Sequence, residues 1–131
     1  MPQSLSLVVV HVIFSTKERR PFFEPDTRAK LHAYLATVAR NADCEGYRVG
    51  GVADHVHLAI RLSRTITIAG LVENLKTSSS KWLKTQSAKL ASFAWQRGYA
   101  CFSVGPVDLD SLCAYIDDQE KHHSQRTFQE E

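Results

Sequence analysis

The chain has 131 residues, 44% hydrophobic and 23% charged, which is enough to bury a core, so we expect residues 1–131 to form a single domain. The sequence has no run of apolar residues long enough to span a membrane and no signal-peptide pattern at its start, which predicts a cytoplasmic protein. The net charge of +2 does not by itself indicate a nucleic-acid partner, and three cysteines without C-x-x-C spacing argue against a disulfide framework or a structural zinc site.

The first half of the chain predicts a strand, a helix and two further strands. Residues 5–14 form an almost unbroken apolar, β-branched run, as expected for a strand buried on both faces. Residues 25–43 predict a helix because apolar residues recur at three- and four-residue spacing. Further strands are expected at residues 47–52 and 54–62, where the Gly50-Gly51 pair would permit a bulge or a close backbone approach.

The second half predicts helix, strand and helix. Residues 67–86 place their apolar side chains within a narrow arc, with lysines on the opposite face. Residues 93–104 have strand-like composition, with a possible kink at Gly98, and a last helix begins at Asp108 or Asp110 and continues to about His123. This order of elements predicts an α+β, ferredoxin-like fold in which helices cover one face of a mainly antiparallel sheet.

Two histidines stand two residues apart on the predicted strand at 54–62. Their spacing sends the imidazoles of His55 and His57 to the same face, roughly 6.6 Å apart at the backbone, where both could bind one metal ion. Alternatively, both rings only decorate a half-exposed sheet face. The apolar residues between and after them would anchor the strand and hold both rings in place, as a preorganised site requires. Asp54 could orient one ring or cap the preceding turn.

Polar side chains also follow one face of the predicted last helix. Ser111, Tyr115, Gln119 and His122 or His123 recur at helical spacing beside the apolar stripe. Tyr115 and Gln119 should therefore point the same way. A tyrosine at the edge of an apolar stripe is commonly a packing residue, so this helix alone does not indicate chemistry.

Three stretches in order resemble a known family. They are DHVHL at 54–58, WQRGY at 95–99 with FSV at 102–104, and YIDDQEKHH at 115–123 followed by TFQEE. With this combination, the chain resembles the short insertion-sequence transposases that move single-stranded DNA, members of the HUH nuclease superfamily with one catalytic tyrosine. The resemblance runs through nearly the full chain.

The resemblance implies that His55, His57 and Gln119 bind a divalent cation, Mg²⁺ or Mn²⁺, and that Tyr115 is the nucleophile. A cation on a non-bridging oxygen would neutralise the charge that develops when a phosphodiester is attacked. The family further implies that hairpins in single-stranded DNA are recognised and that cleavage leaves a 5′-phosphotyrosine and a free 3′-hydroxyl. A later strand transfer would reverse this link.

The resemblance also implies a homodimer in which two sheets join and the tyrosine helix of one subunit completes the metal site of the other. Gly105-Pro106, ahead of the last helix, would provide a hinge for this exchange, although a plain loop fits these residues equally well. Edge-to-edge pairing of the sheets would cover an otherwise exposed strand.

Basic residues are concentrated in the middle of the chain. Residues 55–100 contain seven Lys or Arg and one acid, whereas residues 108–131 contain seven acids and two basic residues. A basic region attracts phosphate, although a solvated helix face gives the same pattern. The candidate DNA contacts are Lys17, Arg19, Arg20, Arg61, Arg64, Lys76, Lys81 and Lys84. Phe22 or Phe23 could stack on unpaired bases, but packing against the following helix is the favoured interpretation.

Two alternative functions also fit this sequence. One is a non-catalytic ferredoxin-like module that binds nucleic-acid hairpins. The other is a different HUH enzyme, a replication initiator or relaxase, against which the small size counts. The sequence stops at Glu131, soon after a motif that usually precedes a further C-terminal segment in relatives, so a shortened copy is a further expectation.

Overall fold

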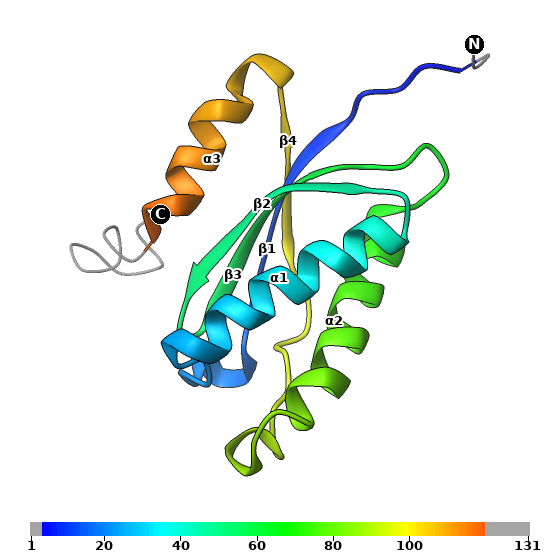
Figure 1. The fold of residues 1–131 in the computed structure, drawn as a ribbon. Coiled ribbons are helices and arrows are strands. Elements are labelled where there is room, and N and C mark those ends of the chain that lie inside the picture. The colour runs from blue at the N-terminus through cyan, green and yellow to red at the C-terminus, as the bar shows by residue number, and fades with distance from the viewer. Residues whose placement is uncertain (1–3, 120–131) are drawn as a thin grey trace.

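A computed structural model describes residues 4–119, which form a four-stranded antiparallel sheet with helices on both faces (Figure 1). The elements in chain order are β1 (Val9–Ser15), η1 (Lys17–Arg19), α1 (Pro25–Asn41), β2 (Glu45–Val52), β3 (His55–Arg61), α2 (Ile68–Lys84), η2 (Ala88–Leu90), β4 (Ala100–Val104), η3 (Pro106–Asp108) and α3 (Leu109–Asp117). The strand order β2-β3-β1-β4 makes two interleaved split β-α-β units. The α+β, ferredoxin-like prediction is therefore confirmed.

The first two helices begin where local chemistry favours a helix start. Pro25 lies in the first turn of α1, where its missing N–H and preset φ cost nothing. Thr67 caps α2, because its Oγ1 accepts a 2.9 Å hydrogen bond from the Gly70 N–H. Both helices then turn a leucine-rich face towards the sheet.

The main hydrophobic core lies between one face of the sheet and the pair α1 and α2, which run side by side (Figure 1). The register of β1 with β3 pairs Val10 with Ile60 and Val12 with Leu58, so these side chains share that face. The helices contribute the fully buried leucines 31, 35, 71 and 75. Burial of such side chains contributes on the order of 1.5–3 kcal/mol each, which makes this face the main source of stability.

Helix α3 packs on β2 and β3 from the opposite face, so α1 and α2 cover one face as predicted while α3 adds a layer on the other (Figure 1). This second face carries His11, Ile13, His55 and His57, since the register pairs Ile13 with His57 and Ser15 with His55. Consequently β3 is buried on both sides, although its sequence alternates like a half-buried strand.

Two predicted strands are longer than those observed. Strand β1 begins at Val9, and Leu5 and Leu7 are exposed, because the registers of β3 and β4 both end opposite Val9 and no described strand pairs further. Strand β4 is limited to Ala100–Val104. The prediction that residues 93–99 are also strand is wrong. Gly98 adopts a left-handed φ of 85°, and Trp95 makes only an isolated bridge, to Thr16.

All three cysteines are free, with Cys44 buried and Cys101 and Cys113 partly buried. None of the helices within residues 4–119 has the length and hydrophobicity needed to cross a lipid bilayer.

Candidate active site

The two histidines of β3 lie beneath α3 on the second face of the sheet. His55 is 0% and His57 1% exposed, and their ring centroids are 5.0 Å apart. The i, i+2 spacing therefore places both imidazoles together, as predicted. They are buried more completely than the interpretation of a half-exposed sheet face would require.

A glycine on the neighbouring strand lets α3 approach this closely. Gly50 of β2 lies opposite His57, and a Cβ at this position would come within 2.6 Å of Ile116 Cγ2 and 2.9 Å of the Ile116 carbonyl oxygen. Ile116 is the fully buried residue of α3. Gly50 thus permits a contact between β2 and the helix that carries Tyr115. The close approach expected between the two strands is at Gly51, where a Cβ would come within 2.2 Å of the His55 carbonyl oxygen.

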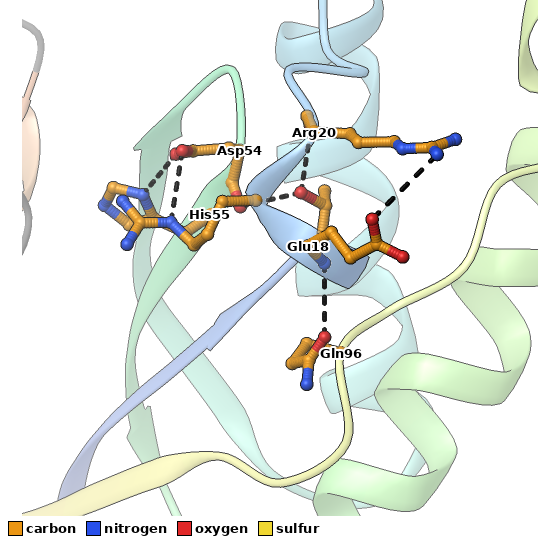
Figure 2. A network of polar contacts seen from close by, with 7 residues as sticks. Glu18, Arg20, Asp54, His55 and Gln96 are labelled. Carbon is orange, nitrogen blue, oxygen red and sulfur yellow. Dashed lines mark hydrogen bonds and ion pairs between the residues drawn. The ribbon is translucent and has the colours of Figure 1, made fainter.

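His55 is held by a carboxylate. Its Nδ1 lies 2.7 Å from Asp54 Oδ1, and Asp54 Oδ2 accepts a hydrogen bond from Arg19 Nε at 3.2 Å (Figure 2). Burial alone would raise the pKa of the Asp54 carboxyl, but the hydrogen bond from His55 and the charges of His55 and Arg19 lower it below its usual value. Asp54 is therefore a carboxylate at neutral pH and favours a proton on His55 Nδ1.

His57 is held by another histidine. His11 of β1 stacks on His57 with centroids 5.1 Å apart, and its Nε2 lies 2.9 Å from His57 Nδ1. One of these two nitrogens must carry the proton that joins them. Each imidazole of the pair thus has a partner at Nδ1 that restricts rotation of the ring.

Tyr115 of α3 packs edge-on against this cluster. Its ring centroid is 5.7 Å from that of His57 and 6.2 Å from that of His11, with interplanar angles of 76° and 78°. Tyr115 and the histidine pair, which are 58 and 60 residues apart in sequence, are therefore neighbours within one chain.

Gln119 follows a turn at Asp118 and is 1% exposed. Its Nε2 donates a 3.2 Å hydrogen bond to the Tyr115 carbonyl oxygen, while its buried Oε1 has no hydrogen-bond partner among residues 4–119. A buried amide oxygen without a partner is costly, so it suits a site where a ligand is bound. His122 and His123, also considered from the sequence, lie outside the described residues.

The described residues limit which side chains could bind a metal ion at the histidine pair. Within residues 4–119 no three His, Cys, Asp or Glu side chains are grouped closely enough to hold a metal ion. A third protein ligand from this part of the chain, for an ion at the histidine pair, would therefore be a group of another type. Gln119 has the appropriate chemistry, a buried and unsatisfied oxygen.

An open cavity of about 600 Å³ lies beside Tyr115 and His57. The sheet contributes His11, Ile13 and Phe102, α3 contributes Leu112, and the segment at residues 97–100 forms another part of the wall. A cavity of this size, with aromatic and apolar walls and an arginine at residue 97, can accommodate a nucleotide-sized ligand.

The basic residues chosen from the sequence fall into two groups. Lys17, Arg20, Arg64, Lys81 and Lys84 are exposed. Arg19 is bonded to Asp54, and Arg61 lies 4.0 Å from Glu45. Lys76 was expected to point outward, which is wrong: its Nζ donates to the carbonyl oxygens of Gln96 and Gly98 at 2.7 and 2.6 Å, and burial lowers its pKa.

Phe22 and Phe23 are packing residues in this structure. Phe23 is 1% exposed, and the rings of Phe22 and Phe23 lie 5.1 and 5.6 Å from that of Phe93. This burial favours packing over base stacking, but the ring contacts are with Phe93 and not with the following helix, which was the partner expected from the sequence.

His11 and Arg97 are not among the site residues predicted from the sequence. His11 interrupts an apolar strand, which was a visible signal, but its significance depends on the β1–β3 pairing that places it on the same face as His57. Arg97 lies in a segment that was predicted to be strand. Its place beside the cavity follows from the irregular path of residues 96–99.

We expect Gly50→Ala to displace α3 and to lower the free energy of unfolding by about 1–3 kcal/mol, the usual cost of overpacking. Gly46→Ala, on the same strand, is the control, because its Cβ would meet only ordinary contacts beginning at 3.6 Å. Urea denaturation measures both, and hydrogen exchange of residues 112–117 reports on α3 directly. Equal stability and exchange in the two variants would contradict the close packing at Gly50.

Comparison with known proteins gives the same fold. One similar structure is the crystal structure of a candidate transposase from Deinococcus radiodurans R1, whose sequence is 19% identical to this chain. The match covers 91% of this chain and 95% of that one, with a TM-score of 0.71. A REP-associated tyrosine transposase bound to a REP hairpin is 14% identical over 94% of this chain and 74% of that one, with a TM-score of 0.67. No curated protein gave a significant match.

The profile of one protein family, described as transposase IS200-like, matches residues 4–119. The match includes the histidine pair, Tyr115 and Gln119. The resemblance seen in the sequence is confirmed, and the chain belongs to the IS200-like transposase family.

Proposed function

We propose that this chain is a single-domain transposase that recognises hairpins in single-stranded DNA, cleaves through a 5′-phosphotyrosine at Tyr115 and rejoins strands with the help of a divalent metal. The observation that carries the proposal is the packing of the Tyr115 ring 5.7 Å from that of His57. Family membership supports DNA cleavage and transfer in general. The roles of individual residues are our inference from their geometry.

In this proposal His55, His57 and Gln119 hold Mg²⁺ or Mn²⁺. The support is chemical: both imidazoles are buried and held at Nδ1, and the Gln119 Oε1 is buried and unsatisfied among residues 4–119. Each ring would bind the ion through its second nitrogen, Nε2. The ion supplies positive charge to a phosphodiester oxygen when bound.

Tyr115 would form the covalent link. Its phenol oxygen attacks phosphorus as the phenol proton leaves, the bond from phosphorus to the 3′ oxygen breaks, and that oxygen takes up a proton as a free 3′-hydroxyl. One phosphodiester replaces another, so a 3′-hydroxyl can reverse the step without an external energy source. The edge-on contacts with His57 and His11 restrict the ring and so orient the phenol for attack.

For the substrate, we propose hairpins in single-stranded DNA. A structural neighbour was solved with a REP hairpin, which supports this class of ligand. In this chain the exposed basic residues Lys17, Arg20, Arg64, Lys81 and Lys84 would contact phosphates. The cavity beside Tyr115 is lined by apolar and aromatic side chains that suit unpaired nucleotides rather than a continuous duplex.

We expect Tyr115→Phe to abolish the covalent adduct, because phenylalanine lacks the attacking oxygen. The purified protein, Mg²⁺ and single-stranded hairpin DNA should give a denaturant-resistant species on a gel. Tyr34→Phe is a matched control, since Tyr34 stacks on Trp82, away from the site, and should retain the adduct. Adduct formed by Tyr115→Phe would exclude this nucleophile, whereas hairpin binding by the wild type without any adduct would favour a non-catalytic binding module.

We expect chelation with EDTA to stop adduct formation and added Mn²⁺ to restore it. Loss of a direct ligand in His57→Ala should weaken Mn²⁺ binding by more than the roughly 10- to 100-fold that loss of a supporting residue costs. Calorimetry measures the affinity. Tyr115→Phe is the comparison, because it should keep metal affinity while losing the adduct, and equal Mn²⁺ affinity in His57→Ala and wild type would contradict the site.

The homodimer implied by the resemblance would use an exposed edge of the sheet. Among the described strands, β4 lies at an edge of the sheet, and Phe102 on β4 is 57% exposed. Val107, after the strand, and Leu5 and Leu7, before β1, are also exposed. We propose that two copies join along this edge, and that α3 can make the contacts described above on the sheet of its partner.

Complementation tests this exchange. Tyr115→Phe and His57→Ala should each be inactive, whereas a refolded mixture should regain adduct. If subunits share sites in trans, random pairing makes half of the dimers mixed, and each mixed dimer has one complete site of two, so the adduct should reach up to about a quarter of the wild-type level. Light scattering on the wild type should give about twice the chain mass of 14.7 kDa. A dimeric but inactive mixture would indicate that each site is complete within one chain.

A further inference from the structure

The turn that follows β1 has an unusual backbone. Glu18 and Arg19, within η1, both have a φ of 58°, in the left-handed region that residues with a Cβ seldom adopt. Neither is glycine, asparagine or aspartate, the residues that tolerate this conformation best. Two such residues in succession persist only where the surroundings hold them.

Long-range hydrogen bonds hold this turn. The Lys17 N–H donates to the Ala94 carbonyl oxygen at 3.0 Å, and the Glu18 N–H donates to Gln96 Oε1 at 3.2 Å (Figure 2). The buried Thr16 hydroxyl donates to the Arg20 carbonyl oxygen at 2.7 Å. Hydrogen bonds to the segment before β4, and one between Thr16 and Arg20 across the turn itself, therefore hold its conformation.

The same turn is tied to the residue beside the histidine pair. The Thr16 N–H donates to the Asp54 carbonyl oxygen at 2.8 Å, which fixes the Asp54 backbone. The side chain of Arg19 then donates from Nε to Asp54 Oδ2 at 3.2 Å, while Asp54 Oδ1 lies 2.7 Å from His55 Nδ1. One carboxylate therefore bridges Arg19 and His55, using a different oxygen for each.

Arg19 and Arg20 differ in what they contact, although they are adjacent and carry the same charge. The Arg19 side chain is 33% exposed and bonded to Asp54, whereas that of Arg20 is 62% exposed and lies 4.0 Å from Glu18. A partly exposed ion pair contributes little stability, so the contact of Arg19 is better explained by the orientation it gives to Asp54.

Resting on the proposed function, we infer that Arg19 is a positioning residue: it holds Asp54 so that the carboxylate keeps His55 in the tautomer and orientation needed to bind a divalent cation through Nε2. This differs from the phosphate contact expected from the sequence. A supporting group of this kind typically changes metal affinity by about 10- to 100-fold without touching the ion.

The test compares Arg19→Gln with Arg20→Gln, which removes the same charge from the same turn. Two measurements are made: Mn²⁺ affinity by calorimetry, and the tautomer of His55 in the metal-free protein by long-range ¹H–¹⁵N spectra, assigned with a His55→Asn variant. We expect Arg19→Gln to mix the His55 tautomers and to weaken Mn²⁺ binding about tenfold or more. Arg20→Gln should leave both unchanged.

Wild-type tautomer and Mn²⁺ affinity in a folded Arg19→Gln variant would overturn the inference. If both variants instead weaken binding of a single-stranded hairpin equally and leave His55 unchanged, Arg19 is a phosphate contact. Circular dichroism confirms that each variant is folded. If the wild type binds no Mn²⁺, the proposed metal site fails, and the tautomer of the metal-free protein still decides whether Arg19 orients His55 through Asp54.

Discussion

The burial of two imidazoles between the sheet and α3 is the constraint on which the rest of the site depends. A polar ring nitrogen taken out of water needs a partner, and the structure supplies one at each Nδ1: Asp54 for His55 and His11 for His57. Covering the rings also requires α3 to lie close to β2, which Gly50 permits. The arrangement that buries the histidines thus also brings Tyr115 against them.

The two faces of the sheet differ in what packs against them. One packs on α1 and α2 and supplies most of the hydrophobic burial, so it forms a rigid support. The other carries the polar cluster, the cavity and α3. Because the split β-α-β topology places β1 and β3 in the centre, residues of both strands meet on this second face. A central position keeps the histidines rigid, as an enzyme site requires, and the IS200-like family provides the context of DNA transposition.

The alternation of apolar and polar residues in strands, and the three- and four-residue spacing of apolar residues in helices, located most strands and helices. Each pattern indicates which side of the strand or helix faces the core. They could not show where a strand loses its partner, which is why residues 5–8 and 93–99 were predicted to be strand. These patterns also could not show that Lys76, predicted on the outward side of its helix, would donate hydrogen bonds to the carbonyl oxygens of residues 96 and 98. Both outcomes depend on segments distant in sequence.

The amino-acid sequence alone determined the family and the spacing that places His55 and His57 on one face. It also determined Tyr115 and Gln119 as candidate site residues, because all of these follow from local periodicity and motif order. Only the tertiary structure decided that α3 covers the face opposite α1 and α2, that His11 joins His57, and that Arg19 contacts Asp54 rather than standing free in solvent. These relations are set by strand register and by hydrogen bonds between segments that are far apart along the chain, which no local pattern encodes.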